Sequence, residues 1–275
     1  MNTIEKRLTS ESNAAKAFDA QSSVFDSIYS SNSTIQYKRD RVREHIESII
    51  PSQSNILELN AGTGEDAIYF AKKGHHVHAT DISEGMQFEL KKKAGSAGLQ
   101  DYISTEICSF TQLEQLQKKD PYDLIFSNFA GLNCTGELTE VLKSLSSLTK
   151  PGGTVTLVVM PGFCLWETMF ALKGRFKTAF RRLRSKNGVQ AHIEGEYFTC
   201  WYYSPSFIYE SLKGDFELVG IEGLCTIVPP SYLEQFPERF PRLFKWLCKM
   251  EDIYKSHRIF RNIGDYFIIS LQKKV

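Results

Sequence analysis

Short apolar runs alternate with longer stretches of helical periodicity along most of this 275-residue chain. Continuous apolar runs are typical of strands buried on both faces, whereas apolar residues that recur every three or four positions indicate the buried face of a helix. The alternation predicts an α/β fold with a doubly wound sheet. We expect strands at 56–59, 76–80, 101–108, 122–129, 154–159, 216–223 and 266–271, and helices at 14–29, 33–50, 84–97, 138–148, 205–212 and 232–254.

Residues 55–83 combine a strand, a glycine-rich turn, a helix and a second strand that ends in an acid. The turn is Asn60-Ala61-Gly62-Thr63-Gly64, and the acid is Asp81. Because ligands of open α/β sheets bind outside the carboxyl ends of the strands, we expect the turn and Asp81 to face one crevice. Small residues let the backbone approach a ligand closely, and an acid can accept two hydrogen bonds from a ribose diol. The stretch therefore predicts a ligand that contains ribose.

Two classes of ligand fit this turn. The string Gly62-x-Gly64-x-x-Ala67 satisfies the dinucleotide fingerprint in its G/A form. The fuller string Glu58-x-Asn60-x-Gly62-x-Gly64 resembles motif I of the class I S-adenosylmethionine-dependent methyltransferases, where such a turn holds the methionine part of the cofactor. The first glycine of that motif is Asn60 here. Since Asn tolerates positive φ best after Gly, we expect the turn to be kept.

Two later segments resemble the same family in the right order. Residues 122–129 match motif IV, where the chain passes the point of methyl transfer, and Asn128 is the candidate for lining it. Lys150-Pro151-Gly152-Gly153 resembles the turn that precedes the family's fifth strand. The resemblance covers roughly residues 14–160 and the final strands. It implies a seven-stranded, mostly parallel sheet whose last strand is antiparallel, the Rossmann-like methyltransferase fold, with S-adenosylmethionine as the cofactor.

The resemblance also implies which residues contact the cofactor. Ile82 and Met86 stand where the family places apolar contacts to adenine. Ser109-Phe110 replaces the acid that often binds the adenine amino group, which leaves a backbone amide to make that contact. The predicted cofactor-binding residues are Glu58, Asn60, Ala61, Gly62, Gly64, Asp81, Ile82, Met86, Ser109, Phe110 and Asn128.

We predict a single methyltransferase domain over residues 1–275, with additions at its start and in its second half. Residues 1–12 look frayed, and the aromatic-rich helices within residues 1–50 either form a lid over the crevice or merely pack on the sheet. Residues 161–200 and 229–260 are insertions that predict a helical cap, and the chain returning from the first insertion is β-like at 194–203. Basic residues dominate 173–186. This pattern predicts contact either with a lipophilic acidic substrate or, peripherally, with an anionic membrane. The alternative is a helix that packs on the core and leaves its charged face in solvent.

Composition narrows the class of protein. Hydrophobic residues make up 42% of the chain and charged residues 24%, typical of globular proteins. The net charge of +1 argues against a general nucleic-acid binder. Residues 1–10 lack an apolar signal region and no run reaches the roughly 20 apolar residues of a membrane span, so we expect a cytoplasmic protein. Six scattered cysteines without a C-x-x-C pair indicate a reduced compartment and no zinc site, and His76 and His78 are interpreted as ordinary strand residues.

The predicted reaction is methyl transfer to a small lipophilic metabolite, preferably on oxygen. Any aligned nucleophile can attack the methyl group in one displacement, so a base is needed only when an acceptor hydroxyl must lose its proton. His192, Glu196, Tyr202 and Tyr203 lie where the chain returns from the predicted cap. Of these we take His192, Tyr202 and Tyr203 as catalytic candidates, and expect one tyrosine in the cap interface and the other in the pocket.

Other functions remain open at this stage. An NAD-dependent oxidoreductase would need a second nucleotide half or a Tyr-x-x-x-Lys pair, and neither is visible. An RNA methyltransferase could use the basic segment 173–186, although no recognition domain is appended. A non-catalytic S-adenosylmethionine-binding protein is the remaining alternative, because Asn60 and Ser109 depart from the family pattern. The sequence does not indicate the oligomeric state.

Overall fold

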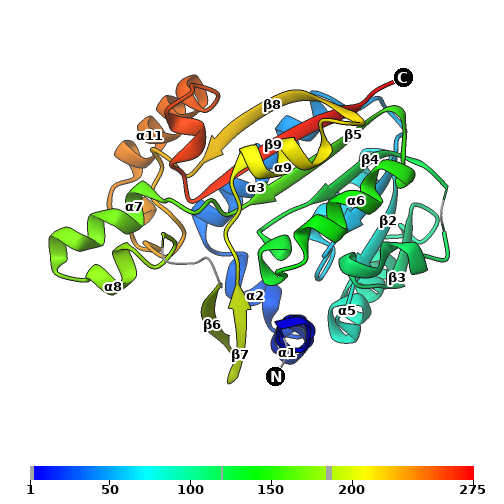
Figure 1. The fold of residues 1–275 in the computed structure, drawn as a ribbon, viewed down its shortest axis with the longest axis horizontal. Helices are drawn as coiled ribbons and strands as arrows, with labels where there is room; N and C mark the ends of the chain where they lie inside the picture. Colours follow the sequence, from blue (N-terminus) through cyan, green and yellow to red (C-terminus); the bar gives the residue numbers. More distant parts are fainter. Residues whose placement is uncertain (1–2, 119, 184–187) are drawn as a thin grey trace.

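The structure is a computed structural model that describes residues 3–118, 120–183 and 188–275. A seven-stranded sheet crosses the molecule in the order β3-β2-β1-β4-β5-β9-β8 (Figure 1). The strands are β1 (Asn55–Leu59), β2 (His76–Asp81), β3 (Ile103–Ile107), β4 (Tyr122–Ser127), β5 (Thr149–Val159), β8 (Phe216–Leu224) and β9 (Tyr266–Lys273). Strand β9 runs antiparallel to both β5 and β8, while β1 to β5 pair in parallel. The predicted fold class is confirmed.

Helices cover both faces of this sheet and build two separate cores. One face packs against α3 (Ser33–Glu47), α4 (Glu65–Lys72) and α5 (Glu84–Ser96), through residues such as Ile46, Phe70 and Leu90. The other packs against α6 (Leu138–Leu148), α9 (Pro205–Leu212) and the 3₁₀ segment η1 (Phe110–Gln115). Two further 3₁₀ segments are η2 (Gly131–Cys134) and η4 (Phe260–Asn262). Each helix buries one apolar stripe, as the helical periodicity predicted.

The N-terminal helices differ from the expectation. Helix α1 (Thr3–Gln21) starts at Thr3, where a frayed segment was expected, and a turn separates it from α2 (Phe25–Tyr29). Helix α1 is fastened to the core by Asp19, whose carboxylate accepts hydrogen bonds from the Ser83 hydroxyl at 2.8 Å and the Gly85 amide at 2.7 Å. The start of α5 thus anchors α1 near the crevice.

The first insertion is helical only in part. It contains α7 (Leu165–Thr168), the 3₁₀ segment η3 (Met169–Lys173) and α8 (Phe176–Ala179). It ends in an antiparallel hairpin of β6 (Val189–Ile193) and β7 (Glu196–Cys200), so the prediction of a helical cap over 161–200 is wrong for its last part. Glu194 and Gly195 both have positive φ, of 47° and 84°, as a tight two-residue hairpin turn requires. Arg184 and Lys186 of the basic segment lie outside the described residues.

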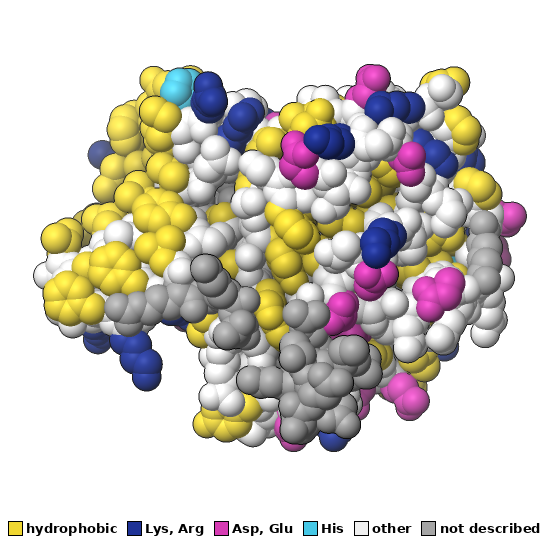
Figure 2. Space-filling model, viewed as in Figure 1, with side chains coloured by type: hydrophobic (Ala, Val, Ile, Leu, Met, Phe, Trp, Pro, Cys, Tyr) yellow, Lys and Arg dark blue, Asp and Glu magenta, His cyan; other side chains and the backbone are white. Residues whose placement is uncertain are grey.

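The second insertion is helical but begins later than predicted. Helix α10 (Phe236–Arg239) is followed by α11 (Pro241–Tyr254), and the break falls before Pro241, since proline disfavours helical conformation in the preceding residue. The two insertions share an exposed apolar patch, shown at the left of Figure 2 over α7, α8 and α11. Its main members are Met169, Leu172, Phe176, Leu243 and Trp246. Contact of this patch with a membrane stays a prediction.

No helix in the described part of the chain combines the length and the apolar content that crossing a bilayer would require.

Candidate active site

A cavity of about 350 Å³ opens where the carboxyl ends of β1, β2 and β4 meet helices α1 to α3. Nine predicted cofactor residues line it: Glu58, Asn60, Ala61, Gly62, Asp81, Ile82, Met86, Phe110 and Asn128. The other two, Gly64 and Ser109, are not among the lining residues. We call the part next to the glycine turn and Asp81 the turn end. We call the part next to Lys38, Ser231 and Tyr266 the β9 end.

The glycine turn has the backbone conformation that the sequence predicted. Asn60, Gly62 and Gly64 all have positive φ, of 48°, 55° and 77°. The Gly62 amide donates to one carboxylate oxygen of Asp81 at 2.8 Å, and the Ser83 amide donates to the other at 2.9 Å. Burial raises the pKa of Asp81, and these backbone hydrogen bonds oppose the rise. Turn and acid therefore form one unit at the strand tips.

Asn60 makes contacts that a glycine could not make. Its side-chain amide donates to the carbonyl oxygen of Asn128 at 2.9 Å, and it accepts a hydrogen bond from the Ser127 hydroxyl at 2.5 Å. Its side chain occupies the space beside Gly131, where an added Cβ would lie 2.2 Å from Asn60 Cγ. The departure from the glycine pattern thus links the tips of β1 and β4.

Two buried carboxylates behind the turn have opposite environments. Asp66 accepts hydrogen bonds from Arg39 at 2.9 Å, Arg43 at 2.7 Å and the Asn128 side chain at 2.8 Å. Burial alone would raise the pKa of Asp66, but the two arginines outweigh burial and lower it. Burial and the charge of Asp66 raise the pKa of Glu58 well above its usual value. One carboxylate oxygen of Glu58 has no hydrogen-bond partner, so it is available to an N–H donor in the cavity.

The N-terminal helices supply much of the cavity wall. Phe18 comes from α1, and Phe25 and Tyr29, whose ring centroids lie 4.7 Å apart, come from α2. Helix α2 is held against the glycine turn because the Thr63 hydroxyl donates to Asp26 at 2.6 Å. The sequence indicated an aromatic helical stripe here but did not assign its residues to the site. The shared helical face of these aromatic residues was the sequence signal that could have assigned them to the cavity wall.

The Ser109 side chain is directed to helix α1. Its hydroxyl donates a short hydrogen bond to Glu11 of α1 and also contacts Thr111 at 2.7 Å. Ser109 therefore links η1 to α1, while its neighbour Phe110 lines the cavity.

None of the three catalytic candidates lines the cavity. His192 is exposed on β6 with its ring centroid 4.4 Å from that of Tyr197. The Tyr202 ring lies under the Arg182 guanidinium at 5.2 Å, and burial raises the Tyr202 pKa. The Tyr203 hydroxyl donates to the carbonyl oxygen of Thr135. The expectation of one tyrosine in the pocket is not met, because the returning strand β7 packs along α1 instead of facing the strand tips.

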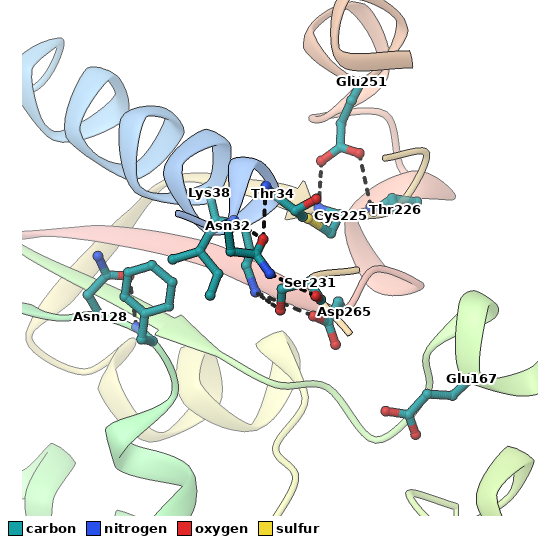
Figure 3. Close-up of polar contacts among 12 residues, drawn as sticks. Asn32, Thr34, Lys38, Asn128, Glu167, Cys225, Thr226, Ser231, Glu251 and Asp265 are labelled. Carbon is teal, nitrogen blue, oxygen red and sulfur yellow. Dashed lines mark hydrogen bonds and ion pairs between the residues drawn. The ribbon is translucent and has the colours of Figure 1, made fainter. Parts of the chain in front are cut away.

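At the β9 end, α3 presents a buried cation to the cavity. The Lys38 ammonium donates to the Ser231 hydroxyl at 3.1 Å and lies 3.7 Å from an Asp265 carboxylate oxygen (Figure 3). It also lies 4.4 Å from the Tyr266 ring centroid. Burial acts to lower the pKa of Lys38, but Tyr266 and Asp265 outweigh it and the pKa is raised. Sequence reasoning did not single out Lys38, because its neighbours in space come from the far end of the chain.

The loop that carries Ser231 is held by a buried acid of the second insertion. Glu251 of α11 accepts hydrogen bonds from the amides of Cys225, Thr226, Ile227 and Val228, at 2.6 to 3.1 Å (Figure 3). Burial raises the pKa of Glu251 to about 7, against the lowering effect of these amides. This carboxylate fixes the path of the chain after β8.

A group with metal-ligating atoms lies outside the cavity. One ligand atom each from Cys164, Glu167 and Asp265 falls within 4.8 Å of the others. However, Glu167 accepts hydrogen bonds from Arg181 and Arg182, and Asp265 accepts one from Arg182 at 2.7 Å. The carboxylates already have cationic partners, so the group is interpreted as an ion-pair network.

The strand order, the glycine turn after β1 and the acid at the tip of β2 define a Rossmann-like methyltransferase fold. A family model described as a methyltransferase domain matches residues 56–153. The 1,6-didemethyltoxoflavin-N1-methyltransferase of Burkholderia thailandensis superposes with a TM-score of 0.56 at 13% identity, over 96% of this chain and 88% of that one. The cyclase SpnF superposes with a TM-score of 0.54 at 16% identity, over 86% and 82%.

Curated relatives have the same domain. The chain is 24% identical over 222 residues to malonyl-acyl-carrier-protein O-methyltransferase of Halorhodospira halophila, which covers 72% of this chain and 68% of that protein. It is 30% identical over 108 residues to tRNA 5-carboxymethoxyuridine methyltransferase of Escherichia coli, over 39% of this chain and 41% of that protein. The chain belongs to the class I S-adenosylmethionine-dependent methyltransferases, and S-adenosylmethionine is its cofactor, as predicted.

Proposed function

We propose that this chain transfers the methyl group of S-adenosylmethionine to an oxygen atom of a small, lipophilic metabolite. The cavity carries the proposal, because its turn end contains most of the predicted cofactor residues and aromatic side chains line much of the remaining wall alongside charged ones. These aromatic residues are Phe18, Phe25, Tyr29, Phe129 and Tyr266. Aromatic walls favour an apolar acceptor, and helices that cover the cavity keep water away from the reacting atoms.

The residues of the turn end fit the cofactor. The unpartnered oxygen of Glu58 would accept an N–H of the cofactor's amino group. Gly62 leaves room for close approach, since the nearest atom to an added Cβ would be Met86 sulfur at 4.0 Å. Asp81 would accept hydrogen bonds from the ribose, and Ile82, Met86 and Phe110 would pack against adenine. When bound, the cofactor supplies an activated methyl group on a sulfonium.

The acceptor side favours an oxygen that is already ionised. A neutral hydroxyl would need a base, and among the described residues no histidine lines the cavity. A carboxylate needs none, so alignment and exclusion of water would be sufficient. The names of two relatives refer to a malonyl group and to 5-carboxymethoxyuridine, and each of these groups contains a carboxylic acid. We therefore rank lipophilic carboxylic acids ahead of phenols and alcohols.

An RNA acceptor is the second candidate, supported by the name of the Escherichia coli relative. The balance of 33 basic and 32 acidic residues argues against it, because RNA binding needs an excess of positive charge. A protein that binds the cofactor without transferring methyl groups is the remaining alternative.

The test is methyl transfer from labelled S-adenosylmethionine to lipophilic acids, phenols, alcohols and bulk tRNA. We expect label in an acid or another small oxygen acceptor, and none in tRNA. Titration with S-adenosylhomocysteine and NAD in parallel should give micromolar binding of the first only. Label in tRNA alone would replace the proposal, and tight cofactor binding without any labelled product would favour the non-methylating alternative.

A further inference from the structure

The β9 end of the cavity lies beyond the residues assigned to the cofactor. Asp81 ends β2 and Tyr266 begins β9, and β1, β4 and β5 lie between these two strands. Four steps between neighbouring strands, at about 4.8 Å each, separate them by roughly 19 Å. The predicted cofactor residues extend from Ser109 and Phe110, which follow β3, to Asn128, which follows β4, and none of them lies on β5 or β9. The space next to Lys38 therefore belongs to the acceptor.

The ammonium of Lys38 is buried, with 2% of the residue exposed, and lines this space. An ammonium has three N–H donors. Among the described residues, Lys38 has one hydrogen bond, to Ser231 at 3.1 Å, whereas Asp265 lies at 3.7 Å. Lys38 can therefore donate to a further acceptor that enters the cavity.

Lys38 shares its nearest carboxylate with a second buried cation. Asp265 also accepts from Arg182 at 2.7 Å, while Glu167 accepts from Arg182 and from the partly exposed Arg181. Lys38 has the longest ion pair of this group, so its charge is the least closely paired. A buried charge that is incompletely paired is costly, so an anion beside Lys38 would be stabilised.

Arg39, the adjacent cation of α3, offers a contrast. It forms an ion pair with Asp66 at 2.9 Å, and its guanidinium lies 4.6 Å from the Phe129 ring centroid. Arg43 shares this carboxylate, but Arg39 is hydrogen-bonded to it directly, whereas Lys38 lies 3.7 Å from Asp265. Lys38 is therefore the better candidate of the two for binding an incoming anion.

We propose that Lys38, together with Ser231, binds an acidic group of the methyl acceptor, so that the substrates of this enzyme are lipophilic organic acids. The inference rests on the proposed function, since it takes the β9 end to hold an acceptor. A carboxylate bound through one oxygen accepts from Lys38 and Ser231, and the Phe129 and Tyr266 rings cover the adjoining apolar part of the molecule. The carboxylate of the cofactor's methionine part could bind Lys38 in the same way. The test must therefore distinguish an acid of the acceptor from the carboxylate of the cofactor.

The test compares decanoate with its uncharged amide, decanamide, by titration into protein saturated with S-adenosylhomocysteine. We expect the wild type to bind decanoate at least about tenfold more tightly, the effect of one charge-assisted hydrogen bond. Lys38→Met should remove this preference and leave decanamide and S-adenosylhomocysteine affinities within about twofold of wild type. Lys143→Met, at an exposed lysine of α6, is the matched control and should change nothing.

Two further variants keep the test decisive if loss of the buried charge prevents folding. Lys38→Arg should keep part of the preference for decanoate. Ser231→Asp places an internal carboxylate beside Lys38 and should abolish the preference without removing the cation. Equal binding of decanoate and decanamide by the wild type would overturn the proposal. So would a Lys38→Met protein that loses affinity for S-adenosylhomocysteine but keeps the preference for decanoate, because Lys38 would then bind the cofactor.

These outcomes separate the inference from the proposed function. Binding of decanoate that depends on Lys38, without methyl transfer to any acceptor, would sustain the anion site and reject the methyltransferase activity. Methyl transfer to an uncharged phenol, at a rate that Lys38→Met leaves unchanged, would sustain the methyltransferase activity and reject the anion site.

Discussion

The two ends of the cavity are built in different ways. At the turn end, the contacts with Asp81 join residues close in sequence, since Gly62 and Ser83 both donate to it. At the β9 end, Lys38 meets Ser231 and Asp265, which lie 193 and 227 residues further along the chain. A site made from one local segment has a sequence signature, whereas a site assembled from distant segments does not. The predictions below test this difference.

The largest expected effect is the loss of cofactor binding in Asp81→Ala. The variant removes the predicted acceptor of ribose hydrogen bonds and leaves the Gly62 and Ser83 amides without this partner. We expect S-adenosylhomocysteine to bind about a hundredfold more weakly, as two charge-assisted hydrogen bonds would give. Isothermal titration measures this change.

Asp123→Ala is the matched control for Asp81→Ala. Asp123 also accepts a hydrogen bond from a backbone amide, that of Asn55 at 2.8 Å, and it pairs with Lys150. However, it lies at the amino end of β4, at the opposite end of the strand from the cavity. It should lower stability while leaving cofactor affinity unchanged. Equal losses of affinity in both variants would mean that Asp81 acts only through the fold.

The next effect concerns the stability of the glycine turn. In Gly64→Ala the added Cβ would lie 2.3 Å from Leu90 Cγ, and residue 64 has a φ of 77°. Left-handed strain of about 1–2 kcal/mol and overpacking of about 1–3 kcal/mol predict a fall in Tm of about 8 °C. Gly74→Ala has a similar φ of 87° but open space, so its Tm should fall by only about 3 °C. Equal shifts, measured by thermal denaturation, would show that the contact with Leu90 contributes nothing.

The smallest effect is a pH dependence at the β9 end. The pKa of Glu251 is about 7 in the folded protein, above its usual value of 4.5, so its contribution to stability is present below pH 4.5 and is lost as the pH rises through 7. Glu251→Gln should be less stable, because an amide cannot accept from all of the backbone donors around it. Its Tm difference from wild type should narrow by about 3 °C between pH 5 and 7.5. A difference that stays constant or widens would contradict the raised pKa.

Local patterns predicted the sheet, the turn and most helix boundaries. The apolar runs are buried on both faces, and the positive φ at Asn60 follows from a side chain that tolerates this conformation. Strand β7 falls within the β-like stretch that the sequence indicated at 194–203, but its partner β6 was missed, because the preceding aromatic and basic residues suggested a helix. The predicted catalytic residues do not line the cavity, and the reason is different. The path of the returning chain depends on packing against α1, which no spacing in the sequence expresses.

The contact between Asn60 and Gly131 has an evolutionary consequence. A side chain at one position requires its absence at the other, since an added Cβ at residue 131 would fall 2.2 Å from Asn60 Cγ. Gly131→Ala alone should be deleterious, while the same change on an Asn60→Gly background avoids this clash with Asn60. The effects of mutations at the two positions should therefore depend on each other. An ancestor with a side chain at residue 131 could acquire Asn60 without a clash only after that residue had become glycine.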